Sequence, residues 1–461
     1  MTSKRAGLSA LAGLLALLVV AGAGAVADDG APVDLPTISV REPQPVLSGL
    51  KGDPVRARAV GALVAPLLRD ASVRGHVGVA VADVESGELR WDSIGDDLAR
   101  ETFVPASTLK LFTAVAALTV LEPDHRFATS VVRTGGPRSG ELVLVGGGDP
   151  LLRRHARSGF SPVDTHAEPA SLTELAADTA RELRADGVRK VRLAYDADLF
   201  TGPALNPTWP SSYVTDGVVT PISALWVSEG RLGPYLRSTD PARDAAEAFA
   251  TSLQRAGVDV VGAVEPGSGD GGRLVAQVRS APLDQLVMHT LALSDNEAAE
   301  VLLRHLALGT QRPGSFAGGV AAMREVLTEL GVPMAGVDLH DGSGLSRLNT
   351  VTLPAVLGVL QQAAAGADQL RAVATGLPVA AFDGTAAVRF LNGDARAGRG
   401  VVQAKTGTLT GVHGLAGTLV TRQGAAMTFV ALTDRVPVSR TYDARDQLDR
   451  IVATLAACGC R

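Results

Sequence analysis

The sequence predicts a mixed α/β (α+β) fold in which strands from both ends of the chain form one sheet. Strand-like segments lie near the beginning, at His76–Val84 and Glu88–Asp92, and alternating segments lie near the end, at Val401–Gly417 and Ala425–Leu432. Segments with helical periodicity flank both groups. We therefore expect one domain built from the two ends of the chain, with an insertion at 141–282.

The composition is that of a globular protein. A chain of 461 residues with 46% hydrophobic and 20% charged residues is long enough for two or three domains with a sizeable core. The formal net charge is −5 and the basic residues do not cluster. This charge pattern argues against a nucleic-acid partner.

The first 27 residues have the pattern of a signal peptide. Lys4 and Arg5 precede the apolar run Ala6–Ala23, and Ala25-Val26-Ala27 fits a signal-peptidase site, so we expect cleavage after Ala27. The alternative is a retained anchor, because about 20 apolar residues also suffice to span a bilayer. A lipoprotein anchor is excluded, since no cysteine follows the run. On either interpretation the remaining chain works outside the cytoplasm, with membrane association as one alternative.

Local signals place the first elements after this segment. Residues 28–54 are rich in Pro and Gly and indicate a linker, and Ala59–Ala71 has the pattern of a short amphipathic helix. Glu85-Ser86-Gly87 is a hairpin signal between the first two strands. The stretch Val104–Val120 predicts a helix that is buried on most faces, with Pro105 suited to its first turn.

The middle and end of the chain alternate between strands and helices. Glu141–Val145 predicts a strand that leads into Gly146–Pro150, a tight turn without the Gly-Lys-Ser/Thr of a phosphate-binding loop. Leu283–Leu308 predicts a helix interrupted at Ser294-Asp295-Asn296, where a second helix could start on a serine cap. The chain ends with a helical pattern at Asp443–Ala456. Three helices are expected to end at glycines, namely Gly187, Gly257 and Gly331. The last two strands are expected to be joined by the turn Arg422–Gly424.

The two cysteines, Cys458 and Cys460, lie next to the C-terminus. Other cysteines are absent and the histidines are scattered, so neither completes the ligand spacing of a metal site. We expect a local disulfide or an unimportant tail, with no metal and no cofactor.

Ser107 and Lys110 are the strongest chemical signal. Three residues apart in a helix, their side chains share one face, and Ser107 falls in the first turn, where backbone N–H groups lack intrahelical partners. A hydroxyl, an amine and a free N–H donor thus converge. These are the nucleophile, base and oxyanion donor of a serine acyl-transfer site.

A plainer interpretation is a capping serine beside a solvated lysine. Two observations favour the chemical one. Lys110 lies in an apolar run, where its ammonium needs a partner or a lowered pKa. The chain also contains only five lysines against 38 arginines, and arginine cannot give up its proton.

Three motifs follow one another in the chain: Ser107-Thr108-Leu109-Lys110, Ser294-Asp295-Asn296 and Lys405-Thr406-Gly407. This trio is similar to that of penicillin-binding proteins and class A β-lactamases. Each motif alone is a weak signal. Together, in order and on an exported chain, they are strong.

Further motifs narrow the resemblance: Gly147–Pro150, Asp341–Arg347, Leu377-Pro378 and Asp383-Gly384-Thr385. With these, nearly all of the mature chain resembles the D-alanyl-D-alanine carboxypeptidases/endopeptidases of the penicillin-binding protein 4 class, peptidase family S13. The resemblance implies a penicillin-binding protein/β-lactamase-like transpeptidase fold, an antiparallel sheet with a helical subdomain. It divides the chain into a signal peptide, a linker, a penicillin-binding catalytic domain and an inserted accessory domain: 1–27, 28–54, 55–140 with 283–461, and 141–282.

The roles expected for the catalytic residues follow from their chemistry. Ser107 attacks the carbonyl of a D-Ala-D-Ala peptide bond in a peptidoglycan stem, and β-lactams acylate the same hydroxyl. Lys110, kept neutral beside Lys405, takes the hydroxyl proton. Ser294 relays a proton to the leaving amine, and Asn296 hydrogen-bonds the substrate amide.

The Lys405 segment is expected to bind the substrate. Lys405, Thr406 and Thr408 offer a cation and hydroxyls to the terminal carboxylate. Gly407 lets the substrate backbone approach as an added strand. The N–H groups of Ser107 and Thr408 are the expected oxyanion donors.

Asp149 and Arg347 are a weaker hypothesis for substrate binding. Stem peptides commonly carry a diaminopimelyl side chain with an amine and a carboxylate. An acidic and a basic residue at the rim of the site would match those two charges. Turn and surface roles are the alternative for both residues.

A secreted serine β-lactamase is the nearest rival. That class needs a glutamate after Ser-Asp-Asn to activate the deacylating water. The glutamates between Asn296 and Lys405 form no Glu-x-x-x-Asn pattern: Glu297, Glu300, Glu325 and Glu329. We therefore expect the penicilloyl enzyme to persist.

Two other classes fit less well. A Ser-His-Asp hydrolase would need a Gly-x-Ser-x-Gly elbow, which the chain lacks. A non-catalytic cell-wall-binding or penicillin-sensing protein would have no reason to keep all of the catalytic residues.

Overall fold

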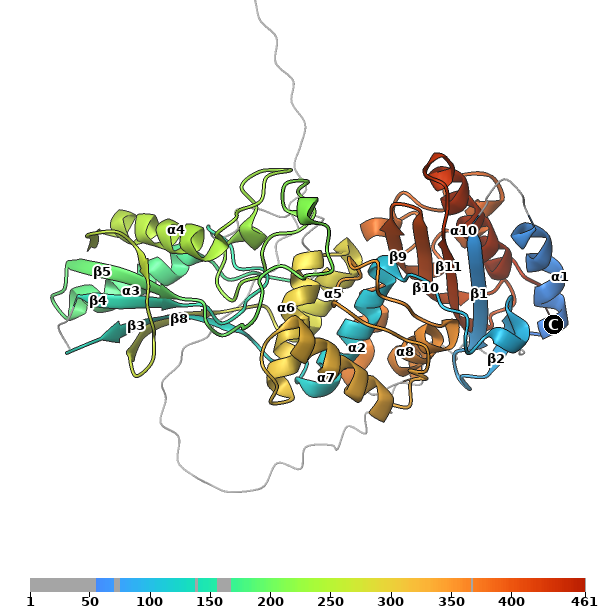
Figure 1. Ribbon diagram of the computed structural model, residues 1–461, viewed down its shortest axis with the longest axis horizontal. Coiled ribbons are helices and arrows are strands. Elements are labelled where there is room, and N and C mark those ends of the chain that lie inside the picture. Colours follow the sequence, from blue (N-terminus) through green and yellow to red (C-terminus); the bar gives the residue numbers. More distant parts are fainter. Residues whose placement is uncertain (1–54, 70–74, 137–139, 156–166, 366–367, 461) are drawn as a thin grey trace, which may run out of the picture. The chain divides into compact units, whose positions relative to one another are not determined.

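The computed structural model describes residues 55–69, 75–136, 140–155, 167–365 and 368–460 (Figure 1). The predicted signal peptide with its cleavage site and the predicted linker lie outside these residues. Among the helices that the structure describes, none is long and apolar enough to cross a bilayer.

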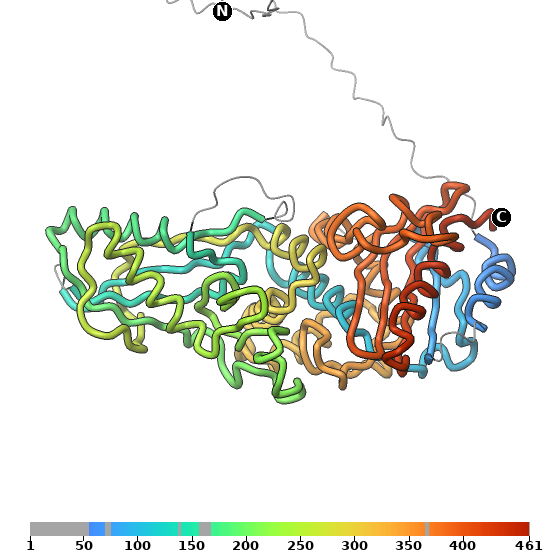
Figure 2. The backbone as a smooth tube through the Cα atoms, turned by 90° about the horizontal axis from the view of Figure 1, so that it is seen from above, coloured from blue at the N-terminus to red at the C-terminus, as the bar shows by residue number. Residues whose placement is uncertain are grey.

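Five antiparallel strands form the first sheet, in the order β2-β1-β11-β10-β9. β1 pairs with β11 along its whole length, so the two ends of the chain share one sheet, as the sequence predicted. Figure 1 shows the blue strand β1 beside the red C-terminal strands, and in Figure 2 the blue and red segments of the chain again lie next to each other. The bounds are His76–Asp83 (β1), Leu89–Asp92 (β2), Val402–Leu409 (β9), Val412–Val420 (β10) and Ala426–Asp434 (β11).

Each face of this sheet packs against different helices, because successive side chains of a strand point to opposite faces. On β1, Val79 packs toward α1 (Ala57–Leu68) and α10 (Thr441–Ala456), whereas Ala80 belongs to the larger core on the other face. There α8 (Leu353–Ala365) covers β1 and β11. Burial on both faces holds β9, which carries the Lys-Thr-Gly motif, in place.

A group of helices around α2 fills this larger core. Nine successive residues of α2, from Lys110 to Leu118, are buried, as expected for a helix enclosed on most sides. α2 contacts its neighbours in the group directly. The bounds are Lys110–Val120 (α2), Leu283–Leu293 (α5), Asn296–Gly309 (α6), Phe316–Glu329 (α7) and Arg371–Thr375 (α9).

A second, mixed sheet lies in the middle of the chain, with the order β6-β5-β4-β3-β8 and β7 beside β5. α3 (Leu172–Ala185) and α4 (Pro241–Arg255) share its core. The sheet includes β3, which lies before residue 141, the predicted start of the insertion. The division into domains stays a prediction, and we use the name inserted unit for this sheet with α3, α4 and their connecting loops. The bounds are Ala128–Thr134 (β3), Glu141–Val145 (β4), Lys190–Asp196 (β5), Asp259–Val260 (β6), Glu265–Pro266 (β7) and Arg273–Arg279 (β8).

Local signals set most element ends. Gly187, Gly257 and Gly331 follow the last residues of α3, α4 and α7 with positive φ, which confirms the predicted glycine caps. The alternating segment 401–417 is two strands rather than one, because Gly411 turns the chain with a φ of 74°. Near the C-terminus, Cys458 and Cys460 form the predicted local disulfide.

Candidate active site

Ser107 lies in a short 3₁₀ turn, Ala106–Leu109, that runs directly into α2. Thr108 Oγ1 donates to the carbonyl of Pro105 at 2.7 Å and fixes this turn. Ala106, just before the serine, has a φ of 47°, a backbone conformation that residues other than glycine rarely adopt. Ser107 is half-buried, and its hydroxyl lies on the same helical face as Lys110, as predicted.

Lys110 is fully buried and its Nζ contacts three oxygens. The distances are 3.0 Å to Ser107 Oγ, 2.8 Å to Asn296 Oδ1 and 2.7 Å to the carbonyl of Ser343. The last two oxygens can only accept, whereas the serine hydroxyl can also donate. A neutral amine has two protons and one lone pair, so it fits these three partners with the lone pair on Ser107.

Burial lowers the pKa of Lys110 to about 8, while the carboxylates of Glu300 and Asp341 oppose that change. An amine with this pKa is neutral in a useful fraction of molecules near pH 7. The site therefore supplies a base at the nucleophile without a histidine.

The rate of acylation should follow this pKa. An amine is a base only in its neutral form, so the rate should rise with pH and level off above an apparent pKa of about 8. Stopped-flow acylation by a chromogenic β-lactam between pH 5.5 and 9.5 measures it. A flat profile would contradict the role of Lys110.

Ser294 and Asn296 occupy the break between α5 and α6. Ser294 adopts a left-handed conformation with a φ of 60°, which ends α5. Asp295, not Ser294, caps α6 by accepting from the N–H of Ala298, so the predicted serine cap is wrong. Because Ser294 does not cap the helix, its side chain is free for the site. Asn296 is the first residue of α6. Its Oδ1 accepts from Lys110 Nζ, and its Nδ2 lies 3.4 Å from the carbonyl of Val218.

Lys405 is fully buried on β9, the edge strand of the first sheet. Its Nζ donates to the carbonyl of Thr406 at 2.9 Å. Burial, and then the positive charge of Lys110, holds the pKa of Lys405 well below its usual value. The charge of Lys110 therefore acts on the Lys405 amine across the site.

The rest of the Lys-Thr-Gly strand faces the Ser107 turn. A Cβ on Gly407 would lie 2.9 Å from the carbonyl of Pro105, so only glycine allows this close approach. Thr408 is exposed, and Thr406 Oγ1 donates to Thr385 Oγ1 at 2.7 Å. Thr385 belongs to the Asp-Gly-Thr motif, which had no assigned role in the sequence analysis.

The loop that holds the Ser343 carbonyl at Lys110 is organised by two buried carboxylates. Asp341 accepts from the N–H groups of Gly344 and Ser346 at 2.9 and 2.6 Å. Glu300, one turn after Asn296 on α6, accepts from the N–H groups of Gly342 and Ser343 at 3.1 and 2.8 Å. From the sequence alone, Glu300 is considered only as the water-activating glutamate of a rival β-lactamase. Its i+4 spacing from Asn296 in an apolar helix was the available signal.

Removal of the Glu300 charge should shift the pH profile. Burial raises the pKa of Glu300 to about 8, so its carboxylate acts on Lys110 mainly in the upper part of the profile. Glu300→Gln removes this charge, which raises the pKa of Lys110, so the rising limb should move to lower pH. The plateau rate should also fall, because an amide NH₂ meets the loop N–H donors. Glu325→Gln, a partly exposed glutamate on α7, is the matched control. An unshifted limb in Glu300→Gln would contradict this role.

Asp149 and Arg347 do not form the expected pair of rim charges. Asp149 is only 3% exposed, accepts from the N–H of Leu151, and has its pKa raised by burial to about 7. Its predicted place at the rim is therefore wrong, because the turn that it stabilises buries it. Arg347 is exposed and donates to the carbonyl of Thr410, just beyond β9, so it remains a candidate at the end of the site.

A cavity of about 460 Å³ borders the Ser294–Asn296 segment. The cavity is also lined by the turn 228–230 of the inserted unit and by Arg231 and Arg237, which follow that turn. Glu297, at the start of α6, accepts from Arg237 Nε at 3.3 Å and lies 3.5 Å from Arg231. These ion pairs connect the inserted unit to the helix that carries Asn296.

Together, the antiparallel sheet, the Ser-Lys helix and the Lys-Thr-Gly edge strand have the parts of a serine hydrolase site. The sequence model of the D-Ala-D-Ala carboxypeptidase 3 (S13) family matches residues 61–238 and 231–455. The chain belongs to this family of serine-type carboxypeptidases, as the resemblance indicated.

Individual relatives agree with this assignment. A carboxypeptidase of Mycobacterium tuberculosis is 34% identical over 412 residues, which cover 88% of this chain and 85% of that protein. A D-alanyl-D-alanine carboxypeptidase of Actinomadura sp. is 31% identical over 461 aligned positions, which cover 80% of this chain and 81% of that protein. The crystal structure of penicillin binding protein 4 from Haemophilus influenzae superposes with a TM-score of 0.69 over 84% of this chain and 98% of that one, at 23% identity. That structural similarity confirms the predicted fold.

Proposed function

We propose that this protein removes the terminal D-alanine from peptidoglycan stem peptides through an acyl-enzyme on Ser107. The observation that carries the proposal is the contact of 3.0 Å between Ser107 Oγ and Lys110 Nζ, whose other two partners can only accept. In the first step the hydroxyl proton passes to the neutral amine while the oxygen bonds to the D-Ala-D-Ala carbonyl carbon. The carbonyl oxygen takes up the developing negative charge, which the N–H groups of Ser107 and Thr408 stabilise.

Collapse of the tetrahedral intermediate breaks the C–N bond and releases D-alanine. The leaving amine needs a proton, which comes from Lys110 through the hydroxyl of Ser294. Lys405 and the Thr406 and Thr408 hydroxyls hold the terminal carboxylate. That negative charge favours the protonated form of Lys405, which burial otherwise disfavours. Water then attacks the ester by the same route in reverse.

The same acylation step serves endopeptidase cleavage, in which the leaving amine belongs to a cross-linked stem instead of free D-alanine. β-Lactams, which present an amide carbonyl and a carboxylate, acylate Ser107 in place of the peptide. The released amine of a β-lactam stays attached to the acyl group, so it also hinders deacylation.

The contacts of the glutamates that follow Asn296 favour a slowly hydrolysed penicilloyl enzyme and argue against β-lactamase activity. Glu297 is paired with arginines, Glu300 binds loop N–H groups, and Glu325 is paired with Arg312. Each of the three is thus committed to a contact within the protein. We therefore expect a long-lived penicilloyl adduct.

Digestion of purified muropeptides, followed by mass spectrometry, tests the proposed activity. Loss of one terminal D-alanine from pentapeptide stems is the expected result, and cleavage of cross-linked dimers would add endopeptidase activity. Intact muropeptides, with penicillin bound covalently, would instead indicate a penicillin sensor. Rapid catalytic hydrolysis of penicillin would indicate a β-lactamase.

We infer that the protein acts outside the cytoplasm. The support is the N-terminal charge and apolar run with the Ala25-Val26-Ala27 site, together with a substrate class that belongs to the cell wall. N-terminal sequencing of the protein from the producing cells should give Asp28 as the first residue. A chain that keeps residues 1–27 and sediments with membranes would favour an uncleaved anchor.

A further inference from the structure

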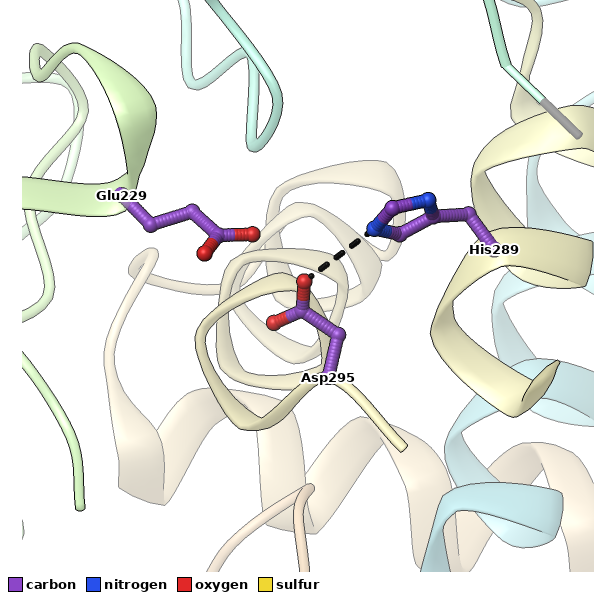
Figure 3. A group of neighbouring side chains, drawn as sticks. All are labelled: Glu229, His289 and Asp295. Atoms are coloured by element: carbon purple, nitrogen blue, oxygen red, sulfur yellow. Dashed lines mark hydrogen bonds and ion pairs between the residues drawn. The ribbon is translucent and has the colours of Figure 1, made fainter. Parts of the chain in front are cut away.

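Three buried side chains from separate segments meet at the cavity beside the Ser294–Asn296 break. Glu229 comes from the turn 228–230 of the inserted unit, His289 from α5 and Asp295 from the start of α6. Figure 3 shows the two carboxylates and the imidazole pointing toward one another. One ligand atom from each lies within 4.8 Å of the others, and His289 Nε2 lies 3.3 Å from Asp295 Oδ2.

Carboxylate oxygens of Glu229 and Asp295 lie within 4.8 Å of each other in this cluster. Two buried carboxylates this close repel each other, and a cation between them would relieve that repulsion. The N–H of Ala298 donates to Oδ1 of Asp295, and Nε of Arg231 donates to Oε2 of Glu229. Oδ2 of Asp295 and Oε1 of Glu229 are therefore the oxygens that would meet a cation.

The chemistry of the three ligands selects the kind of cation. Mg²⁺ and Ca²⁺ prefer oxygen ligands alone, whereas one imidazole with two carboxylates suits Zn²⁺ and similar transition-metal ions. Tetrahedral Zn²⁺ with bonds of about 2.1 Å separates its ligands by about 3.4 Å. The His289–Asp295 pair already has this spacing, so only the Glu229 side chain must move closer. The cavity leaves room for water at the fourth position.

The charged groups around the cluster balance one another formally. Glu297 is paired with Arg237 and lies 3.5 Å from Arg231. Arg231 is also paired with Glu229, so it shares its charge between the two glutamates. The cavity is lined by three carboxylates, those of Glu229, Asp295 and Glu297, and by three guanidinium groups, those of Arg153, Arg231 and Arg237. The preference for a metal ion therefore comes from the set of ligand atoms and not from an excess of negative charge.

We propose that Glu229, His289 and Asp295 bind one divalent transition-metal ion, with Zn²⁺ as the best fit. The ion joins the inserted unit to the α5–α6 break, next to the catalytic Ser294 and Asn296. The sequence analysis expected no metal, because the ligands lie 60 and 6 residues apart and match no metal-binding spacing. This site does not depend on the proposed peptidase activity.

Isothermal titration of the purified, tag-free and chelator-treated protein with ZnCl₂ tests the site. We expect one ion per chain with a Kd of about 1 μM or tighter, and no comparable binding of MgCl₂. His289→Asn and Glu229→Gln should each weaken Zn²⁺ binding by at least about 100-fold. His340→Asn is the matched control, because His340 forms a His–Asp pair with Asp338 outside the cluster.

Covalent labelling by fluorescent penicillin, measured on the same variants, separates loss of the site from misfolding. A variant that is labelled but does not bind Zn²⁺ supports the proposal. Co²⁺ in place of Zn²⁺ should give a visible absorption band that His289→Asn abolishes. Absence of stoichiometric Zn²⁺ binding by the wild-type protein, or equal binding by both cluster variants and the control, would overturn the proposal.

Discussion

Replacing Ser107 by alanine is expected to abolish covalent labelling by penicillin and to reduce kcat for D-Ala-D-Ala hydrolysis by at least about 10⁴-fold. The reason is that the acyl group has no other acceptor at this position. The hydroxyl contacts the Lys110 amine at 3.0 Å, and Gly407 of the edge strand β9 closely approaches Pro105, two residues before Ser107.

The variant should keep its fold, because Ser107 is only half-buried and the Thr108–Pro105 contact still fixes the turn. Ser268→Ala, at an exposed serine of the inserted unit, is the control and should label normally. Gel fluorescence and substrate kinetics give the two readouts. Stoichiometric labelling of Ser107→Ala would show that another residue is the nucleophile.

Replacing Lys110 by methionine is expected to slow acylation by about 10³- to 10⁴-fold, because the variant keeps the nucleophile but loses its base. The methionine has a similar length and removes the buried charge. It also leaves Asn296 Oδ1 and the Ser343 carbonyl without their donor, which should lower stability by about 1–3 kcal/mol.

Lys190→Met is the matched control, since Lys190 is exposed on β5. Stopped-flow acylation and thermal unfolding should be measured together, so that a loss of rate can be separated from a loss of fold. A folded Lys110→Met protein with a nearly wild-type acylation rate would assign the base elsewhere. It would also remove the reason for the pH dependence near 8.

The sequence was sufficient to predict those features that depend on residues close together in the chain. Ser107 and Lys110 share a face because they are three residues apart at a helix start, and the structure places their side chains in contact. The pairing of the chain ends was predictable as well, since β1 and β11 each need a partner strand. Gly187, Gly257 and Gly331 marked helix ends through their conformational freedom alone.

The sequence was insufficient where the site depends on backbone groups and burial. The Ser343 carbonyl is a main partner of Lys110, yet a carbonyl is present at every residue and leaves no signature. Glu300 acquires its role only when α6 packs against the 341–346 loop. Asp149 looked like a rim acid, because the same turn motif can expose or bury its carboxylate. The Glu229–His289–Asp295 cluster forms only when the inserted unit meets the α5–α6 break.

The central claim is that Ser107 forms the acyl-enzyme. Trypsin should release residues 101–110, Glu-Thr-Phe-Val-Pro-Ala-Ser-Thr-Leu-Lys, because Arg100 and Lys110 bound this segment. After incubation of the protein with penicillin, mass spectrometry should find this peptide heavier by one penicilloyl group, with the fragment ions placing it on Ser107. An adduct on a different peptide, or an unmodified 101–110 peptide from fully penicillin-bound protein, would contradict the account.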